Sequence, residues 1–389
     1  MVQGKEMLLH CAIGSVYIGQ CLDDTVAFLG NCRRFCPTEA MRYYAYCDDF
    51  GPLNISSVTD FIRALDKETA DYPDSKIVLS VGEGRRTLTN AVFLLGCHMV
   101  LRLDMTPEQA ALRFRWLATS QIEAYRDATF HSPDFRLNLI DCWRGLARGM
   151  ERGWVRHCAR GCMWGAVDMD EYRHFENPAN GSLTVVVPGV FVAMQGPEDL
   201  PDGAEYVDRE QGWRVFSPAY YADILRATGV TTVVRLNEAR YAPAELTLRG
   251  LKHVDLEFGD CTCPPTPVVS AFMAAVGCAN GLVAVHCQAG LGRTGTLIAL
   301  YMMRHHGFTA REAMGWLRIM RPGSVIGQQQ HYLCAVEADM VRSGGATDVS
   351  KDNGEVEEEA KKLATQVADG VVRRCVRFKE SEDGPLISK

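Results

Sequence analysis

A cysteine and an arginine stand six residues apart in the segment HCQAGLGRTG, with two glycines between them. Cys287 follows the apolar run GLVAVH, which predicts a strand, and precedes TGTLIALYMM, which predicts a helix. Backbone amides in such a turn can curl around one anion, and the helix N-terminus adds the positive end of its dipole. Because the same field favours a sulfur anion, the pattern predicts a nucleophilic thiolate in a phosphate-binding loop.

The side chains around this cysteine suit phosphate transfer through a phosphocysteine. The guanidinium of Arg293 can donate a planar pair of hydrogen bonds to two phosphate oxygens. The hydroxyl of Thr294 could donate to the sulfur and ease its departure as thiolate. His286 is expected to fix the loop through its ring nitrogens, with the tautomer left open. The predicted phosphate-binding loop comprises His286, Gln288, Ala289, Gly290, Leu291, Gly292 and Arg293.

Cleavage of a phosphate ester also needs a proton donor, because the alkoxide of serine or threonine is a poor leaving group. Asp260, in the loop EFGDCTCPPTP, is the candidate general acid. Asp255 is the alternative, although it falls inside a predicted strand rather than on a loop able to close over a site. In a second step, Asp260 would act as a base on water positioned by Gln329 or Gln330. This chemistry needs no cofactor, and no residues have metal-ligand spacing.

Other interpretations of the same residues stay open. The cysteine could be a buried structural residue, or the loop could capture phosphorylated partners without turnover. A phosphoinositide phosphatase would use the same loop, usually with lysines for the charged headgroup, which QAGLG lacks. Cys261 or Cys263 could trap Cys287 as a reversible disulfide, although sequence alone does not establish the sulfur geometry.

The elements that must position the loop occur twice along the chain. Residues 77–115 and 283–318 each show an apolar strand, a glycine-rich turn, an apolar helix and a second helix opened by a threonine, Thr106 or Thr309. Alternation of strand and helix predicts two tandem α/β domains, each with a mainly parallel sheet flanked by helices.

In the first copy the position of the cysteine falls on a glycine, Gly82 or Gly84, depending on the alignment. Without a thiol, this domain is predicted to be inert and to help shape a substrate groove. Arg85 and Arg86 could hold an anion there, or could be solvated or ion-paired.

The helix expected within DCWRGLARGMERGW has apolar residues suited to lying against a neighbour. The charged C-terminal tail is predicted to be mostly disordered. We predict four segments, namely 1–150 for the first domain, 151–182 for a helical connection, 183–342 for the catalytic domain and 343–389 for the tail.

Composition narrows the class of protein. The 389 residues are 47% hydrophobic and 23% charged, which suits two folded domains plus a tail. No apolar run reaches the ~20 residues of a membrane span, and the start lacks a signal-peptide layout. We therefore expect a protein of the cytoplasm or nucleus that does not insert into a membrane and whose cysteines stay reduced thiols. The net charge of −7 argues against nucleic-acid binding. Oligomeric state is left open.

The stretch HCQAGLGRTGTLIALYMMRHHGFTAREAMGWLRIMRPGSVIGQQQHYL resembles the signature of the cell-division-cycle-fourteen family of dual-specificity phosphatases, the mitotic-exit phosphatases. Further matches at DFGPLN, YRDATF, DMDEYRHFE and VVRLN extend the resemblance from about residue 40 to 335. It implies that Cys287 is the nucleophile, Arg293 the phosphate-binding arginine and Asp260 the acid. It also implies that only the second domain is catalytic.

The same resemblance implies which substrates the protein acts on, in which cellular process and at which locations. Family members remove phosphate from serine or threonine followed by proline, so phosphoproteins made by proline-directed kinases are the expected partners, with phosphotyrosine also accepted. A role in mitotic exit and cytokinesis is implied, with nucleolus, spindle or centrosome as locations.

The segment DMDEYRHFE resembles the part of the family that receives a basic residue downstream of the target proline. Asp170, Glu171 and Glu176 keep the acidic character of this groove, whereas Arg173 and Ser182 stand where we expect acidic residues. The requirement for a basic residue is therefore expected to be weaker. Two further departures are Cys261, in place of a glycine after the acid, and Gln328, in place of a proline.

Overall fold

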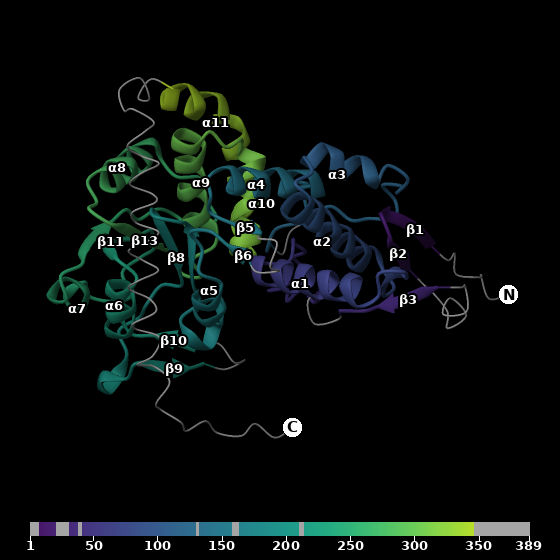
Figure 1. Ribbon diagram of the computed structural model, residues 1–389. Coiled ribbons are helices and arrows are strands. Elements are labelled where there is room, and N and C mark those ends of the chain that lie inside the picture. Colours follow the sequence, from purple (N-terminus) through teal and green to yellow (C-terminus); the bar gives the residue numbers. More distant parts are fainter. Residues whose placement is uncertain are drawn as a thin grey trace, which may run out of the picture. The chain divides into compact units, whose positions relative to one another are not determined.

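The computed structural model describes residues 8–20, 31–37, 41–129, 132–157, 163–209 and 214–345 (Figure 1). Nearly all of the predicted tail, 343–389, lies outside these residues. Within the described part of the chain, no helix combines the length and apolar character needed to cross a bilayer.

The N-terminal domain is built on a sheet whose strand order is β1-β2-β4-β3. Strand β4 pairs in parallel with both β2 and β3, and β1 pairs antiparallel with β2. Its strands are β1 (Leu8–Ile13), β2 (Val16–Gln20), β3 (Cys32–Phe35) and β4 (Lys76–Val81). Its helices are α1 (Ile55–Asp71), α2 (Arg85–Leu103), α3 (Pro107–Arg113) and α4 (Leu139–Glu151).

The C-terminal domain is built on a five-stranded sheet in the order β12-β11-β13-β8-β7. All neighbours are parallel except β7 and β8, which confirms the predicted mainly parallel sheet. Its strands are β7 (Leu183–Val187), β8 (Phe191–Met194), β11 (Val230–Arg235), β12 (Lys252–Asp255) and β13 (Leu282–His286). Its helices are α6 (Pro218–Ala227), α7 (Ala244–Leu248), α8 (Thr266–Gly277), α9 (Gly292–His306), α10 (Ala310–Met320) and α11 (Gln328–Gly345).

The segment between and around the sheets carries shorter elements. Two-stranded ribbons are formed by β5 (Arg156–His157) with β6 (Met163–Trp164), and by β9 (Tyr206–Asp208) with β10 (Arg214–Phe216). Helix α5 (Met169–Glu176) precedes β7 and packs against it. The predicted helical connection 151–182 therefore contains β5, β6 and α5, whereas the helix expected within DCWRGLARGMERGW is α4 and ends where that segment starts.

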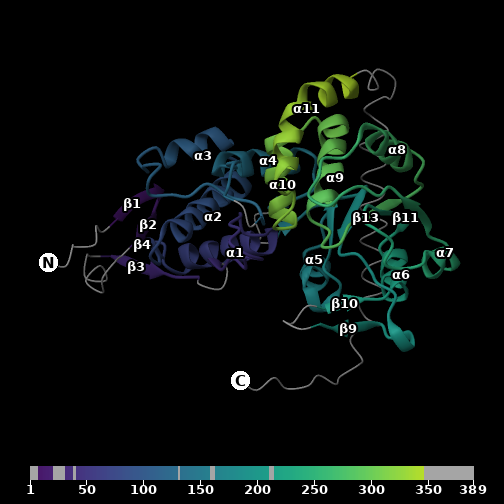
Figure 2. The same ribbon diagram turned by 180° about the vertical axis from the view of Figure 1, so that it is seen from behind.

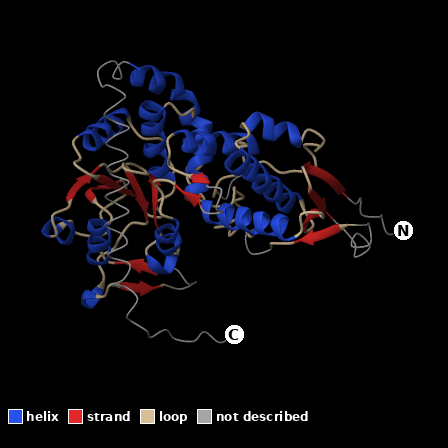
Figure 3. Ribbon diagram, in the orientation of Figure 1, coloured by secondary structure: helices blue, strands red, loops and turns tan. Residues whose placement is uncertain are grey.

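Both faces of the C-terminal sheet are covered by helices (Figure 3). Along β13, Val283 and Val285 belong to the core cluster that includes residues of α8 and α9, whereas Ala284 belongs to the cluster that includes residues of α6 and α7. Successive residues of a strand point to opposite faces, so a continuous apolar run is what a doubly covered strand requires.

The repeat predicted from sequence is present in the structure. Thr106 caps α3 and Thr309 caps α10, each through a capping box in which the residue three positions later hydrogen-bonds back. Each copy thus runs strand, loop, long helix and capped helix.

Helices α4 and α10 join the two domains and lie side by side in both views (Figures 1 and 2). A Cβ atom on Gly145 would lie 2.4 Å from the carbonyl oxygen of Glu312, and one on Gly315 would lie 2.6 Å from that of Asp141. The helices can approach this closely only because glycines face each other. The prediction that this helix lies against a neighbour is confirmed.

Candidate active site

The predicted phosphate-binding loop links β13 to α9, and Cys287 is its first residue, with 3% of its surface exposed. The loop carbonyls accept hydrogen bonds from outside the loop. Gly196 N–H donates to the oxygen of Gln288 at 2.9 Å. Arg321 donates to the oxygens of Ala289 and Gly290 at 3.0 and 2.9 Å. Because C=O and the next N–H point in opposite directions across a trans peptide, the following amides face the loop centre, as an anion cradle requires.

Two glycines let this loop pack against the end of β8. Gly290 has φ +68°, and a Cβ there would lie 2.0 Å from the carbonyl oxygen of Met194. A Cβ on Gly196 would lie 2.3 Å from the carbonyl oxygen of Cys287. Any larger residue at either position must displace the loop.

The structure assigns the tautomer of His286. Complete burial lowers the pKa of this imidazole to about 3, so the ring is neutral and has one N–H. Nδ1 lies 3.1 Å from the carbonyl oxygen of Cys287, which can only accept, so Nδ1 holds the proton. Nε2 then accepts from the hydroxyl of Tyr241 at 2.8 Å. Tyr241 also contacts Nε2 of His253 at 2.9 Å, which completes a buried polar chain behind the nucleophile.

The acid loop, residues 257–267 with the candidate general acid, brings Asp260 to Arg293, the arginine predicted to bind phosphate. Nε of the buried Arg293 lies 3.1 Å from Oδ1 of Asp260, an ion-pair contact without hydrogen-bond geometry, and its Nη1 donates to the oxygen of Phe258 at 3.1 Å. The Asp260 side chain is 63% exposed and so remains accessible to a bound phosphoester. The alternative, Asp255, is instead held by Nε of Arg235 at 2.6 Å.

The two glutamines proposed to position water have different surroundings. Gln329 donates to the oxygen of Thr262 in the acid loop at 3.0 Å, and a Cβ on Gly292 would lie 3.1 Å from its Oε1. Gln330 accepts from the buried Arg318 at 2.8 Å. Gln329 is therefore the glutamine that lies against both the phosphate loop and the acid loop.

Thr294 is the residue predicted to donate a hydrogen bond to the sulfur of Cys287. Its side chain is fully buried, and its hydroxyl has no hydrogen-bond partner within the described chain. A buried hydroxyl without a partner is costly, so this hydroxyl remains free for the predicted hydrogen bond to the sulfur of Cys287.

The first copy of the loop is shorter than the second. Three residues, 82–84, separate β4 from α2, whereas five, 287–291, separate β13 from α9. Gly82 directly follows its strand as Cys287 does, so Gly82 is the equivalent position. The side-chain amide of Gln20 donates to the oxygens of Gly82 and Gly84. This loop has neither a thiol nor the length to encircle a phosphate.

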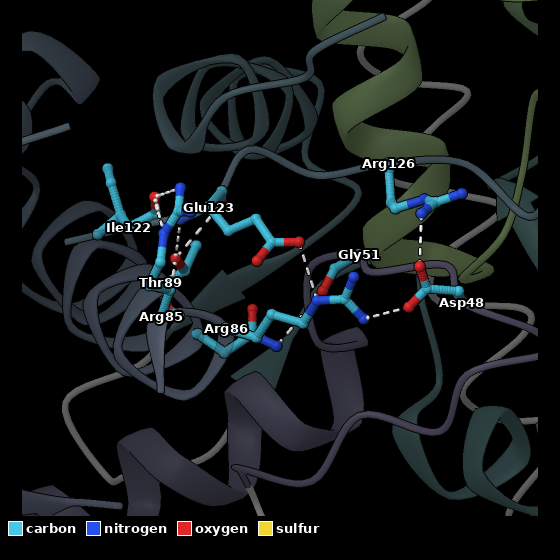
Figure 4. A network of polar contacts seen from close by, with 9 residues as sticks. Asp48, Gly51, Arg85, Arg86, Thr89, Ile122, Glu123 and Arg126 are labelled. Carbon is cyan, nitrogen blue, oxygen red and sulfur yellow. Dashed lines mark hydrogen bonds and ion pairs between the residues drawn. The ribbon is translucent and has the colours of Figure 1, made fainter. Parts of the chain in front are cut away.

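The arginines that begin α2 are bound within the protein (Figure 4). Arg85 donates twice to the carbonyl oxygen of Ile122, and Arg86 bridges Glu123 at 2.9 Å and Asp48 at 3.0 Å. Arg86 is therefore ion-paired and Arg85 is bound to a backbone carbonyl, rather than either side chain being left to hold an anion.

The acidic residues of the predicted groove lie on α5. Asp170 is fully exposed, whereas burial raises the pKa of Glu171 and of Glu176. Glu176 accepts from the amide of Asn54 at 2.7 Å. Arg173 donates to Asp60 of α1 at 2.7 Å and lies 3.5 Å from Asp170, so it neutralises part of the charge.

Several supporting residues were not predicted. Arg321 and Tyr241 hold the loop from behind, and Ser182 accepts from Arg321 at 3.0 Å rather than extending the acidic groove. The arginine in RPGS follows a helix, and no pattern in the sequence distinguishes it from a surface cation.

Cys261, Cys263 and Cys287 are free thiols, so the disulfide hypothesis stays a prediction. Across the described ranges, no group of three or more acidic, cysteine or histidine side chains could hold a metal ion.

A cysteine that begins a loop with inward-facing amides, with an arginine and a loop aspartate beside it on an α/β domain, defines a cysteine-based phosphatase. Sequence comparison agrees. The family description "Dual specificity protein phosphatase, N-terminal half" matches residues 22–149, and "Dual specificity phosphatase, catalytic domain" matches residues 222–339.

Curated relatives define the family further. Human CDC14C is 35% identical over 316 residues, which cover 81% of this chain and 68% of that protein. Human CDC14A is 37% identical over 315 residues, covering 80% of this chain and 50% of that protein. The chain therefore belongs to the CDC14 family of dual specificity protein phosphatases. Among solved structures, a putative protein tyrosine phosphatase from Leishmania major is 22% identical over 37% of this chain and 85% of its own, with a TM-score of 0.31.

Proposed function

We propose that this phosphatase hydrolyses phosphoserine and phosphothreonine followed by proline, and phosphotyrosine, through a phosphocysteine on Cys287. The contact of Arg293 with Asp260 beside the loop supports the proposal, because a guanidinium able to bind phosphate and a carboxyl group able to donate a proton lie 3.1 Å apart.

In the first step the sulfur of Cys287 attacks phosphorus and the P–O bond to the substrate breaks. Asp260 delivers its proton to the departing oxygen, and Arg293 with the loop amides stabilises the charge of the transferring phosphoryl group. In the second step water attacks phosphorus, the P–S bond breaks and thiolate leaves. Asp260 takes the proton from water, and Gln329 orients that water.

Release of inorganic phosphate from a phosphoserine-proline peptide tests this function. Wild type should release phosphate, and Cys287→Ser should release none. A protein that binds the peptide without turnover would show the rival function, a phosphoprotein-binding module. Phosphoinositides assayed in parallel test the remaining alternative, a phosphoinositide phosphatase. We expect the peptide to be the preferred substrate.

We further propose that a basic residue downstream of proline is only a weak requirement. Arg173 lies 3.5 Å from Asp170 and forms an ion pair with Asp60 of α1, so it offsets negative charge where the basic residue is expected to bind. A peptide panel that varies the residue after the phosphosite and the charge two positions beyond tests proline selectivity and this relaxation together.

We propose a role in cell division, which the family resemblance implies, and action in the cytoplasm or nucleus. Imaging of the tagged full chain through the cell cycle tests this location.

A further inference from the structure

The loop that precedes α11, whose first turn carries Gln329 and Gln330, is held by the N-terminal domain. Gly327 N–H donates to Oδ2 of Asp127 at 2.6 Å, a short hydrogen bond to a carboxylate that is 3% exposed. Val325 and Gly327 have φ +64° and +57°, so this loop has an unusual backbone conformation that needs support from its surroundings. Asp127 supplies such support from 200 residues away in the sequence.

The position of Gly327 determines the position of Gln329. Ile326, the residue before Gly327, exchanges two hydrogen bonds with Gln329. Ile326 N–H donates to Gln329 Oε1 at 3.1 Å, and Gln329 N–H donates to the carbonyl oxygen of Ile326 at 3.2 Å. The side-chain amide of Gln329 then reaches Thr262. A shift of the peptide at Gly327 therefore moves the group that orients water.

Arg126, the residue before Asp127, is joined by polar contacts to the start of α2 in the first domain (Figure 4). Arg86, at the start of α2, contacts Asp48, and Asp48 accepts from Arg126 at 2.6 Å. The backbone of Arg126 exchanges hydrogen bonds with Phe50 in both directions. A continuous set of polar contacts thus joins Arg86, at the start of α2, to the residue before Asp127.

A second feature offers a competing role for the same carboxylate. Arg318 is 1% exposed and donates to the oxygens of Ser324 and Val325. Burial lowers the pKa of this guanidinium, and the carboxylate of Asp127 opposes that lowering. Asp127 could thus matter as a compensating charge for Arg318 or as the acceptor that fixes Gly327.

We propose that Asp127 is a positioning residue for the second half-reaction, in which it fixes Gly327 and so places Gln329 for attack of water on the phosphocysteine. The proposal rests on the proposed function. It gives the inert domain a part in turnover, because the loop that completes the reaction is supported from that domain.

Two substitutions separate position from charge. Asp127→Asn keeps an oxygen at the same reach and loses the charge, whereas Asp127→Glu keeps the charge and moves the oxygen by one methylene. If position matters, Asp127→Glu should slow phosphocysteine hydrolysis about 10- to 100-fold, as misplacement by ~1 Å commonly does, with Asp127→Asn changed far less.

The measurement is a pre-steady-state burst with p-nitrophenyl phosphate, together with rapid quench for phosphocysteine. Asp127→Glu should show a burst near one equivalent of nitrophenol, with kcat and KM lowered together and kcat/KM nearly unchanged. Arg148→Ala is the matched control, because it removes contacts to the oxygens of His306 and Gly307 between the same two domains. It should leave the hydrolysis step unchanged.

The proposal would be overturned if the two variants hydrolysed the phosphocysteine at equal rates, or if Asp127→Asn hydrolysed it more slowly. Asp127 would then act as a compensating charge for Arg318. Thermal melts check that each variant is folded. If Asp127→Glu does not fold, Asp127→Ser replaces it. The side chain of serine is too short to reach Gly327, so phosphocysteine hydrolysis should again be slower than in Asp127→Asn. Loss of all turnover in wild type would instead contradict the proposed function, so the two failures are distinguishable.

Discussion

Nε of Arg293 lies 3.1 Å from Oδ1 of Asp260, across 33 positions of sequence. The phosphate-binding arginine extends from the buried start of α9, and the carboxylate comes from an exposed loop after β12. Their contact shows the acid loop closed over the phosphate loop. A substrate phosphate that takes the arginine's donors would leave Asp260 beside the ester oxygen.

Asp260→Asn tests the general acid. An amide cannot donate a proton to a departing alkoxide, so kcat/KM toward a phosphoserine peptide should fall about 10²- to 10⁴-fold. The loss should be much smaller for p-nitrophenyl phosphate, whose leaving group needs little protonation. Asp255→Asn is the control, because that carboxylate is held by Arg235. Equal losses for both substrates would contradict the assignment.

Gly290→Ala tests the packing of the phosphate loop. The new Cβ would meet the carbonyl oxygen of Met194 at 2.0 Å from a backbone with φ +68°. We expect a loss of about 1–3 kcal/mol in stability from backbone strain alone. Displacement of the loop should also lower kcat/KM about 100-fold. Urea denaturation and phosphopeptide kinetics measure the two effects.

Gly277→Ala provides the comparison for this substitution. It lies at the end of α8 with open space around it, so the same added methyl group should leave activity unchanged. It should keep or raise stability by up to ~1 kcal/mol. If Gly290→Ala behaved like Gly277→Ala, the loop would not be packed against β8 as described.

His286 makes stability depend on pH. Burial lowers its folded-state pKa to about 3, below the unfolded value near 6.5, so the unfolded chain binds a proton that the folded one does not. Its contribution is therefore present above about pH 6.5 and is lost as pH falls toward 3, at ~1.4 kcal/mol per pH unit. Urea denaturation at pH 7, 6 and 5 measures this slope.

His286→Asn is the matched variant for this prediction. Its side-chain N–H can replace the donation from Nδ1 to the carbonyl of Cys287, and it does not titrate. Stability of the variant should fall less steeply between pH 6 and 5. Parallel slopes for the two proteins would exclude His286 as the titrating group.

Arg173→Glu tests the groove. The substitution removes the ion pair with Asp60 and adds negative charge beside Asp170. We expect the preference for a peptide with lysine two positions after proline, relative to alanine, to rise about fivefold, which corresponds to ~1 kcal/mol. Arg249→Glu, at the end of α7, is the charge-matched control. An unchanged ratio would mean that this part of α5 does not contact substrate.

Much of the fold followed from local patterns. The apolar run before Cys287 became β13, and the threonines at 106 and 309 became caps of α3 and α10. These features depend on short-range rules, because capping and strand formation involve residues near one another in the chain. The loop residues were recognisable for the same reason, since the motif is contiguous.

Residues that act across the fold escaped such reasoning. Arg321 supports the loop through the oxygens of Ala289 and Gly290, more than 30 positions away, and Tyr241 reaches His286 across 45 positions. Their types alone do not distinguish them from surface residues. Only packing showed which carbonyl or ring nitrogen each one reaches.

The amino-acid sequence by itself predicted Cys287 as the nucleophile. It also determined the glycine-rich loop after Cys287, the duplicated strand and helix pattern and the absence of a thiol from the first copy, because each depends on neighbouring residues. The tertiary structure decided which residues meet: Asp260 rather than Asp255 lies at Arg293, Gln329 rather than Gln330 lies at Thr262, and Arg86 is ion-paired. Those choices depend on distances between segments far apart in the chain, which are fixed only when the sheets and the paired helices α4 and α10 pack together.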